Sequence, residues 1–524
     1  MPPRKRASRT KRARKPSLVA ALKRPSAYDH DVASVRVAET HISWVFLTGA
    51  YAYKVKKPVT FSFLDFSTLE RRRRFCEEEL RLNRRLAPQL YLGVVPIGGE
   101  AKALRVGAEP ALEYAVKMRE FPDDARLDRR LEAGALEPEP LRAFGARLAA
   151  FHAAQPPLAP SAATARAIAA ARGNFAELAE HLRARELREL RELDALREWT
   201  DERAGSIEPL IESRVALGRY RECHGDLHLE NLLWLDGEIL AFDALEFDAE
   251  LREIDVASEA AFLAMDLQAH GRADLAYEFL GAYLEAGGDY EALEVLRFYL
   301  VYRALVRAKV RALKAAQKSA EAGRAELKPY FDTARALVAA HTPLLVITRG
   351  LSGSGKTHVT QELIGALRAV RVRSDLERKR LHGVEALART SSSVGAGLYD
   401  PRATERTYAR LAEVAATALR NGFDAIVDAT FLRRAEREAF ARLAADARAR
   451  FAILDCTAPE AVLRSRIEAR AAAGRDASEA DLAVLDRQLL GLEPLAADEQ
   501  PSAVRVATDA RLDLPALLAA LARR

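Results

Sequence analysis

Residues 350–357 read Gly350-Leu351-Ser352-Gly353-Ser354-Gly355-Lys356-Thr357, and they match the pattern G-x-x-x-x-G-K-[ST] at every fixed position. The apolar run Leu344-Leu345-Val346-Ile347 precedes this segment, and a helical pattern follows it. Glycines allow the backbone to fold closely around a phosphate group, and the amides at the start of a helix direct partial positive charge toward it. The sequence therefore predicts a strand, a phosphate-binding loop and a helix at this point.

The positions of this loop have separate expected roles in binding ATP. Lys356 is expected to reach the β- and γ-phosphates, and the hydroxyl of Thr357 is expected to hold Mg²⁺. The residues expected to surround the phosphates are Gly350, Ser352, Gly353, Ser354 and Gly355.

Strand-like and helical patterns alternate through the rest of this part of the chain, and such alternation favours a parallel sheet covered by helices. Pro343 ends the polar helical segment that comes before the first strand. Residues 343–524 are therefore predicted to form an α/β P-loop NTPase fold with a parallel sheet, of a size that suits a small kinase. The expected strands lie at 344–348, 370–372, 425–427 and 451–454, and the expected helices follow Lys356 and cover 404–420.

Length and composition limit the class of protein. A chain of 524 residues is too long for one hydrophobic core and suggests about three compact units. No apolar run approaches the length of about 20 residues that a membrane span needs, and no signal-peptide pattern is evident. Cys76, Cys223 and Cys456 are too widely spaced for a disulfide framework or zinc-ligand pattern. A cytoplasmic protein is expected.

The net charge of +6 comes from the N-terminus. Residues 1–15 contain eight arginines and lysines and no acidic residue, so the remainder of the chain is slightly acidic. Residues 1–29 are predicted to form a basic disordered tail, which could attract RNA, DNA or an anionic surface. A solvated tail without a dedicated partner is the favoured interpretation.

A second motif lies about 120 residues upstream, where residues 224–231 read His224-Gly225-Asp226-Leu227-His228-Leu229-Glu230-Asn231. Two short apolar runs, 232–235 and 239–242, follow it and lead to Asp243. The arrangement resembles the catalytic loop and metal-binding aspartate of the protein-kinase-like superfamily, and the form H-G-D-x-H-x-x-N is similar to that of aminoglycoside phosphotransferases and related small-molecule kinases.

This resemblance implies a role for each polar residue. Asp226 would accept the proton of a substrate hydroxyl, and Asn231 and Asp243 would hold Mg²⁺ on the phosphates of ATP. It also implies an α+β bilobal fold, with a strand-rich N-lobe over 30–122 and a helical C-lobe over 123–342. Asp255 matches a family aspartate that braces the catalytic loop, although a helix N-cap is the alternative.

The N-lobe offers candidates for a phosphate-binding lysine and its glutamate partner. Lys54, in a strand-like segment, and Glu79, in the helical stretch 68–86, resemble the lysine and glutamate pair of kinase N-lobes. Lys56 points to the same face of the strand and is an alternative to Lys54, and Glu77 or Glu78 could replace Glu79. Residues 114–121 look like the strand that enters the hinge between lobes.

Two departures from the kinase pattern affect the loop that would cover the phosphates. Only Gly49 stands where protein kinases have a glycine-rich loop, and Ala244-Leu245 follows Asp243 where they have Phe-Gly. The acidic residues Glu246, Asp248, Glu250 and Glu253 could attract a cationic substrate, but a solvated loop is the favoured interpretation.

Other residues of the P-loop module resemble those of small P-loop kinases such as polynucleotide kinase. Asp375 is similar to the carboxylate that faces the acceptor hydroxyl, and Asp428 is similar to the Walker B acid that supports Mg²⁺. Arg464 and Arg470 resemble the ATP-binding arginines of a lid, with Arg466 at the same helical spacing. Weaker candidates for phosphate or acceptor contacts are Arg433, Arg434 and Arg437.

The order of the two modules resembles that of bacterial fusion proteins described as bifunctional aminoglycoside phosphotransferase/ATP-binding proteins. That resemblance implies an ATP- and Mg²⁺-dependent phosphotransferase that acts on a small-molecule hydroxyl, fused to a P-loop kinase domain. The alternative is a regulatory or nucleic-acid-associated ATP-binding protein, in which the P-loop half could be a nucleic-acid end kinase.

Overall fold

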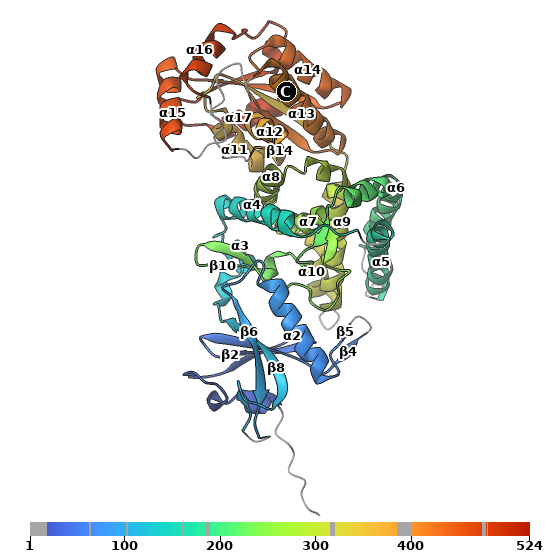
Figure 1. Ribbon diagram of the computed structural model, residues 1–524. Coiled ribbons are helices and arrows are strands. Elements are labelled where there is room, and N and C mark those ends of the chain that lie inside the picture. The colour runs from blue at the N-terminus through green and yellow to red at the C-terminus, as the bar shows by residue number, and fades with distance from the viewer. Residues whose placement is uncertain are drawn as a thin grey trace, which may run out of the picture. The chain divides into compact units, whose positions relative to one another are not determined.

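A mainly antiparallel, strand-rich region and a helix-rich region with a parallel sheet make up the computed structural model (Figure 1). The described residues divide into two units. The first extends to Gly134 and includes His224–Asp226 and Glu230–Arg252, and the second contains the remaining residues. The structure describes 18–61, 64–100, 103–159, 162–184, 189–314, 320–384, 400–473, 478 and 480–524.

Part of the predicted tail is ordered. Residues 1–17, which carry the basic run, lie outside the described residues, but α1 (Leu18–Leu22) and η1 (Pro25–Ala27) are formed. Ala21 and Leu22 are buried in a cluster with Phe46 and Tyr53. The expectation of disorder up to residue 29 is therefore wrong after residue 17, because an apolar segment there packs on the sheet.

The first unit is built on a six-stranded antiparallel sheet in the order β1-β2-β3-β8-β6-β7. Helix α2 (Leu69–Asn83) packs on this sheet through Cys76, which shares a buried cluster with Val116 of β8. The Thr68 hydroxyl accepts a hydrogen bond from the Arg71 N–H and caps α2. The strands are β1 (Arg36–Glu39), β2 (Ser43–Leu47), β3 (Tyr51–Lys56), β6 (Tyr91–Gly98), β7 (Arg105–Val106) and β8 (Ala111–Arg119). Smaller elements are β4 (Thr60–Phe61), β5 (Leu64–Asp65), η2 (Asp123–Ala125) and α3 (Leu127–Glu132).

A short hairpin in the first unit brings the two predicted metal ligands together. Strands β10 (Leu232–Leu235) and β11 (Glu238–Ala241) pair antiparallel, with Leu232 opposite Ala241. The Phe242 N–H donates to the Asn231 carbonyl oxygen over 3.0 Å. Asn231, just before β10, therefore lies beside Phe242, the residue that follows β11 and precedes Asp243.

The second unit begins with the helices expected for a C-lobe, and their core includes a buried ion-pair group. Arg214 bonds to both oxygens of Asp255 and to Asp289, and all three residues are buried. The short strands β9 (Tyr220–Glu222) and β12 (Glu253–Asp255) of this unit pair antiparallel. Of η3 (Leu229–Asn231), Leu229 belongs to the second unit and the other two residues belong to the first. The helices are α4 (Pro138–Ala154), α5 (Ala163–Ala184), α6 (Leu190–Ala216), α7 (Val256–Ala269), α8 (Ala273–Gly287), η4 (Tyr290–Ala292), α9 (Leu293–Lys314) and α10 (Ala320–Val338).

The second unit ends with a five-stranded parallel sheet in the order β14-β15-β13-β16-β17. This confirms the predicted parallel sheet. The central strand β13 is buried along its whole length because both faces are covered. The strands are β13 (Leu344–Arg349), β14 (Ala369–Arg373), β15 (Asp424–Asp428), β16 (Arg450–Thr457) and β17 (Ala503–Ala507). The helices are α11 (Lys356–Leu367), α12 (Ser374–Leu381), α13 (Pro401–Arg420), α14 (Arg434–Asp446), α15 (Glu460–Ala473), α16 (Leu482–Leu490), η7 (Gln500–Ser502) and α17 (Leu514–Ala522).

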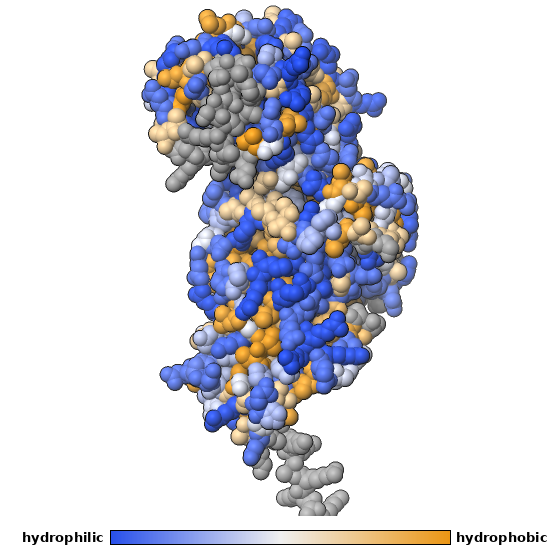
Figure 2. Space-filling view, viewed as in Figure 1, coloured by the Kyte–Doolittle hydropathy of each residue, from blue (hydrophilic) through white to orange (hydrophobic). Residues whose placement is uncertain are grey.

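No described helix combines the length and the apolar composition needed to cross a membrane. On the face shown in Figure 2, hydrophilic residues predominate and hydrophobic residues are interspersed among them.

Two candidate nucleotide sites

The candidate lysines of the first unit share one glutamate. The Lys54 ammonium lies 2.5 Å from an Asp243 carboxylate oxygen and 2.9 Å from Glu79 Oε1. Lys56 lies 2.8 Å from the other Glu79 oxygen and also contacts Glu246. Since β-strand side chains alternate, Lys54 and Lys56 reach the same side of β3, where α2 presents Glu79. Of the two lysines, Lys54 alone contacts Asp243, the predicted metal ligand.

The surroundings of these groups shift their pKa values in opposite directions. Burial raises the pKa of Glu79, but Lys54 and Lys56 lower it by more, so the pKa of this carboxyl lies below its usual value. Burial lowers the pKa of Lys54, but Asp243 and Glu79 raise it well above its usual value. Both shifts favour the charged forms, so the ion pairs persist at neutral pH.

The other two glutamates considered for this pair lie elsewhere on α2. Glu77 pairs with Arg73 over 2.9 Å, and both side chains are about half exposed. Glu78 bonds to Arg81 and to Arg252. Glu79 is therefore the member of the glutamate run that the helix directs at the lysines.

Glu246 does not belong to a solvated loop. Its side chain is 4% exposed and contacts Lys56, so that part of the expectation for the acidic cluster is wrong. Burial raises the pKa of Glu246, Lys56 opposes that rise, and Glu79 adds to it. No sequence signal distinguishes Glu246 from the acidic residues that follow it, because its burial depends on a partner 190 residues away.

Substituting the two lysines is expected to give different defects. Lys54→Met should weaken ATP-dependent transfer at the first site about a hundredfold, because it removes a charge that would contact phosphate. Lys56→Met should chiefly lower the free energy of unfolding, by about 3–5 kcal/mol, because it leaves the buried carboxylate of Glu246 without its paired cation. Turnover and urea unfolding, both measured in a Lys356→Ala background, would separate the effects. Equal loss of transfer in both variants would contradict the assignment of Lys54.

The backbone around Asp243 is held by several hydrogen bonds. Asp243 adopts a left-handed conformation with φ of 63°, and its N–H donates to the Tyr91 hydroxyl over 3.1 Å. The next N–H, of Ala244, donates to Asn83 Oδ1 over 2.9 Å. Asn83 and Tyr91 were not predicted as site residues, because neither carries a local signal that relates it to a segment about 150 residues away.

The predicted catalytic residues lie in contact. Asn231 Nδ2 donates to Asp226 Oδ2 over 2.9 Å and to the Asp226 carbonyl oxygen over 3.0 Å. The amide nitrogen of Asn231 is therefore engaged, and its oxygen is the atom suited to a hard cation such as Mg²⁺. His224 donates from Nε2 to the Phe242 carbonyl oxygen and accepts at Nδ1 from the Asp226 N–H. His224 thus ties the segment of Asp226 to the segment of Asp243.

Gly225 permits the close approach of this loop to its neighbours. Its φ is +89°, and an added Cβ would lie 3.0 Å from the Leu251 carbonyl oxygen and 3.1 Å from a Leu245 methyl group. A larger residue would strain the backbone and displace these neighbours. The glycine before Asp226 is therefore required by local geometry.

A buried aspartate in the second unit anchors the middle of the motif. Asp266 Oδ2 accepts from the Leu229 N–H over 2.9 Å, and Asp266 Oδ1 accepts from the Tyr330 hydroxyl over 3.1 Å. Asp255, in contrast, caps α7 by accepting from the Ala257 N–H. The N-cap interpretation of Asp255 is therefore confirmed. Asp266 was not predicted as a site residue, and the sequence signal for it is a lone acid within the apolar run 262–267.

The phosphate-binding loop lies between β13 and α11, and its glycines have the geometry expected of them. Gly353 and Gly355 have φ of +80° and +77°. A Cβ on Gly353 would meet the Leu463 carbonyl oxygen at 2.7 Å, and one on Gly350 would meet the Cys456 carbonyl oxygen at 2.6 Å. The loop is therefore packed against neighbouring backbone, where side chains do not fit.

A cavity of about 880 Å³ opens at this loop. The structure brings together most of the predicted second-site residues there, including the acceptor candidate Asp375 in the first turn of α12. The predicted residues in its lining are Ser352, Gly353, Gly355, Lys356, Thr357, Asp375, Asp428, Arg433, Arg466 and Arg470. Lining residues that were not predicted as site residues include Arg373, Arg378, Thr404, Tyr408, Arg487 and Gln488.

The predicted lid arginines differ in position. Arg464 pairs with Glu460 and Asp486. It is not one of the described residues that line the cavity. Arg466 does line it and donates to the Gly353 carbonyl oxygen over 3.2 Å. Arg470 lines it as well, but the adjoining lid segment 474–477 lies outside the described residues. The helical periodicity of the arginines did not distinguish the face toward the cavity from the face away from it.

The lysine of the loop has a lowered pKa. Burial lowers the pKa of Lys356, and Asp428 opposes this effect. The Lys356 ammonium donates to the carbonyl oxygens of Gly350 and Leu351 over 3.0 and 2.8 Å. Thr357 and Asp428 both face the same cavity, and their hydroxyl and carboxylate oxygens form a donor set that suits Mg²⁺.

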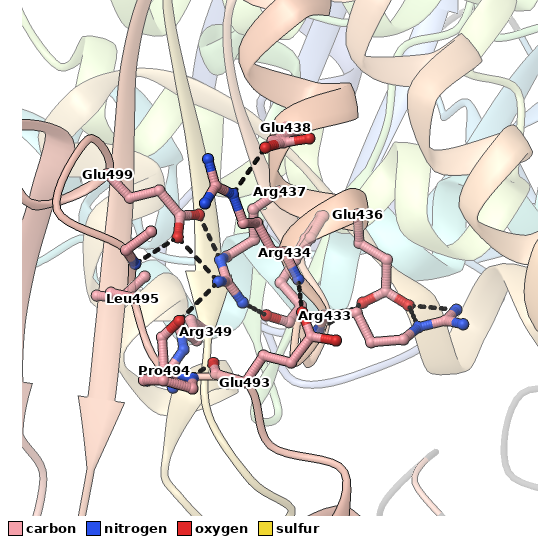
Figure 3. Close-up of polar contacts among 12 residues, drawn as sticks. Arg349, Arg433, Arg434, Glu436, Arg437, Glu438, Glu493, Pro494, Leu495 and Glu499 are labelled. Atoms are coloured by element: carbon pink, nitrogen blue, oxygen red, sulfur yellow. Dashed lines mark hydrogen bonds and ion pairs between the residues drawn. The ribbon is translucent and has the colours of Figure 1, made fainter.

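The weaker arginine candidates follow β15, and Figure 3 shows their contacts. Arg437 is fully buried, bonds to both oxygens of Glu499 over 2.6 and 2.9 Å, and donates to backbone carbonyl oxygens. Arg434 contacts Glu438 and Asp498. Arg433 alone of the three lines the cavity, where it pairs with Glu436. Arg437 therefore stabilises the fold as a buried ion pair with Glu499. The expectation that Arg437 contacts a phosphate or the acceptor is not supported.

The buried Arg437–Glu499 pair leads to a stability prediction. Arg437→Met should lower the free energy of unfolding of the second unit by about 3–5 kcal/mol, because Glu499 would remain buried without its partner. Denaturant unfolding would measure the loss. The double variant Arg437→Met/Glu499→Leu serves as a control, since it removes both charges and should restore most of the stability. An unchanged midpoint in the single variant would count against this interpretation.

Family models match both parts of the chain. The model of the phosphotransferase enzyme family matches residues 60–299, and a model of the AAA domain matches residues 345–495. Similar solved structures include a gluconokinase from Sinorhizobium meliloti, with 21% identity, 35% of this chain and 94% of that chain covered, and a TM-score of 0.26. Another is a choline kinase from Cryptosporidium parvum, with 12% identity, 58% and 90% covered, and a TM-score of 0.36.

Relatives that align with most of the chain occur among curated proteins. Uncharacterized proteins from Mycobacterium tuberculosis and Mycobacterium bovis are each 33% identical to this chain over 451 residues. The aligned region covers 85% of this chain and 88% of each relative. Both modules are kinase-like, and the chain is a phosphotransferase. The chain belongs to the family of fusion proteins that join a protein-kinase-like phosphotransferase module, of the aminoglycoside phosphotransferase class, to a P-loop kinase module.

Proposed function

We propose that the chain contains two separate ATP- and Mg²⁺-dependent kinase sites and that the first phosphorylates a hydroxyl group of a small molecule. The observation that carries this proposal is that two contacts between predicted site residues occur in the same unit. Lys54 lies against Asp243, and Asn231 lies against Asp226. These groups supply a phosphate ligand, two metal ligands and a proton acceptor, which together meet the needs of phosphoryl transfer.

At the first site, the side chains divide the tasks of phosphoryl transfer among them. Lys54 binds the phosphates of ATP. Asp226 takes the proton of the substrate hydroxyl while the oxygen of that hydroxyl forms a bond to the γ-phosphorus. The bond from that phosphorus to the oxygen of the leaving ADP breaks, and Asp226 later releases the proton to water. Asn231 keeps the Asp226 carboxylate in place through its amide N–H. When bound, Mg²⁺ neutralises charge on the phosphates.

At the second site, the phosphate-binding loop and Lys356 bind the phosphates of a second ATP, and Arg466 and Arg470 supply further positive charge. Asp375 lines the same cavity and directs the acceptor hydroxyl toward the γ-phosphorus. Thr357 and Asp428 are the residues that would hold Mg²⁺ there. The acceptor is a second small molecule, and a 5′-hydroxyl nucleic-acid end is the alternative.

The experiment that tests both sites uses labelled ATP and a metabolite extract. Wild-type protein is expected to form two separable labelled products, one lost in Asp226→Asn and the other lost in Lys356→Ala. Nucleotide binding without transferred label would favour the regulatory alternative. Oligonucleotides with 5′-hydroxyl ends, added as acceptors, test the end-kinase variant directly.

The nucleic-acid alternative also makes a prediction about the basic tail. Deleting residues 1–15 should abolish a salt-sensitive interaction with RNA or DNA if the tail binds nucleic acid, because counterion release makes such binding depend steeply on salt. Binding with the same salt dependence after the deletion would exclude this role of the tail.

A further inference from the structure

Within the second unit, helix α8 of the phosphotransferase module packs closely on helix α11, which begins at the phosphate-binding loop. Glycines face the contact from both helices. A Cβ on Gly365 of α11 would lie 3.0 Å from the Asp274 carbonyl oxygen of α8, and a Cβ on Gly281 of α8 would lie 3.5 Å from an Ile364 methyl group. The absence of side chains at these two positions allows the helix backbones to approach.

Polar contacts cross the same boundary at two places along α8. Glu278 accepts from Gln361 Nε2 of α11 over 2.9 Å. Glu285, two turns later, accepts from Arg371 of β14 through both of its oxygens, over 2.7 and 3.2 Å. Arg371 also donates to the Gln361 side-chain oxygen over 2.9 Å. The two glutamates therefore connect α8 to both α11 and β14.

Arg371 extends this network to the predicted metal ligands. Its side chain is only 3% exposed, and its Nη1 donates to the Thr360 hydroxyl over 3.3 Å and to the Thr357 carbonyl oxygen over 3.4 Å. The Thr360 hydroxyl in turn lies 3.3 Å from Asp428 Oδ2. One buried guanidinium thus touches the backbone of Thr357 and the residue that contacts Asp428.

We propose that the Glu285–Arg371 pair is a positioning device for the metal-binding residues of the P-loop site. Mg²⁺-dependent nucleotide binding at that site therefore depends on a side chain supplied by the phosphotransferase module. This inference rests on the proposed function of the second site and extends it, because it makes the first module a structural part of the second site.

The physical argument concerns charge as well as geometry. A planar guanidinium that spans a carboxylate and two backbone or side-chain acceptors has one orientation, so it fixes the relative positions of those partners. Glu285 also neutralises the positive charge of Arg371. Without that carboxylate, a buried positive charge would remain beside Thr357 and Asp428, and it would oppose the binding of a divalent cation.

The test uses the full-length protein, a fluorescent ATP analogue and a titration with Mg²⁺. The signal of interest is the part of the binding that Lys356→Ala abolishes, which reports the P-loop site. Glu285→Gln keeps the shape of the side chain but removes its charge. It should raise the Mg²⁺ concentration for half-maximal binding about fivefold, while binding measured in EDTA stays unchanged. The double variant Glu285→Gln/Arg371→Met, which also removes the positive charge, should recover part of that loss.

A matched control is available at the same boundary. Glu291 of η4 pairs with Arg410 of α13 over 2.7 Å, and Arg410 also pairs with Glu377 of α12. Glu291→Gln should leave the Mg²⁺ titration unchanged, and thermal unfolding of every variant separates stability from metal binding. Arg371→Lys keeps the charge but loses the planar fork, and it should give an intermediate Mg²⁺ requirement.

The outcomes distinguish this inference from the proposed function. Wild-type protein without any binding that depends on Lys356 would overturn the proposed function of the second site and this inference with it. Binding that depends on Lys356, with the same Mg²⁺ titration in wild type and Glu285→Gln, would overturn the inference alone. A lower melting temperature without a shift in the Mg²⁺ titration would assign Glu285 a structural role only.

Discussion

Asp226→Asn is expected to lower the rate of phosphoryl transfer at the first site about a thousandfold, within the range that general-base catalysis contributes. The substitution keeps the size of the side chain and its contact with Asn231, but an amide does not accept the proton of the acceptor hydroxyl. Nucleotide affinity at this site should change little, since Lys54 and Asp243 stay in place. Single-turnover transfer of labelled phosphate, in a Lys356→Ala background, would measure the effect.

Asp236→Asn is the matched control for this experiment. Asp236 lies in the turn between β10 and β11, is about half exposed, and pairs with the exposed Arg119. An aspartate close in sequence to the site but paired at the surface should be replaceable without loss of transfer. If Asp226→Asn retained the wild-type rate, Asp226 would not be the proton acceptor, whatever the behaviour of the control.

Lys356→Ala is expected to lower the rate of phosphoryl transfer at the second site by about two to three orders of magnitude. This is the usual effect of removing a group that stabilises the charge developing in the transition state. Nucleotide affinity should fall as well, because the lysine contacts the phosphates in both the ground state and the transition state. Formation of the first-site product should be unaffected. Labelled products resolved from one reaction mixture would report both sites together.

Lys328→Ala controls for the loss of a positive charge in the same unit. Lys328 lies on α10, is mostly exposed, and contacts Asp332 of the same helix. Transfer at both sites should remain at the wild-type rate in this variant. If Lys356→Ala left the second product intact, the phosphate-binding loop would have to serve another purpose, such as nucleotide sensing.

Local sequence was sufficient to predict the two motifs and the fold around them. The loop 350–357 and the motif 224–231 each place their functional groups within eight consecutive residues, so their geometry depends on short-range backbone conformation. The alternation of apolar and helical segments after Pro343 likewise predicted the parallel sheet, because burial on both faces produces continuous apolar strands. Among the described strands of this sheet, β17 alone was not anticipated. The helices α12, α14, α16 and α17 were not anticipated either.

Choices between neighbouring residues depended on contacts that are distant in the sequence. Lys54 and Lys56 share one face of β3, and only the positions of Asp243 and Glu246, each about 190 residues away, distinguish their surroundings. The arginines of α15 share helical spacing, and only packing determines that Arg466 faces the loop while Arg464 faces Asp486. Periodicity identifies a face of an element but does not identify what packs against it.

The sequence by itself determined the two phosphate-handling motifs, their order along the chain and the fold class of each module. Tertiary structure decided which of several equivalent charges enter a site and which are buried as ion pairs, as for Glu246 and Arg437. It also decided that Arg371, a charged residue in an otherwise buried strand, meets Glu285 of the other module. The physical reason is that motifs are local, whereas burial and ion pairing depend on partners that only folding brings together.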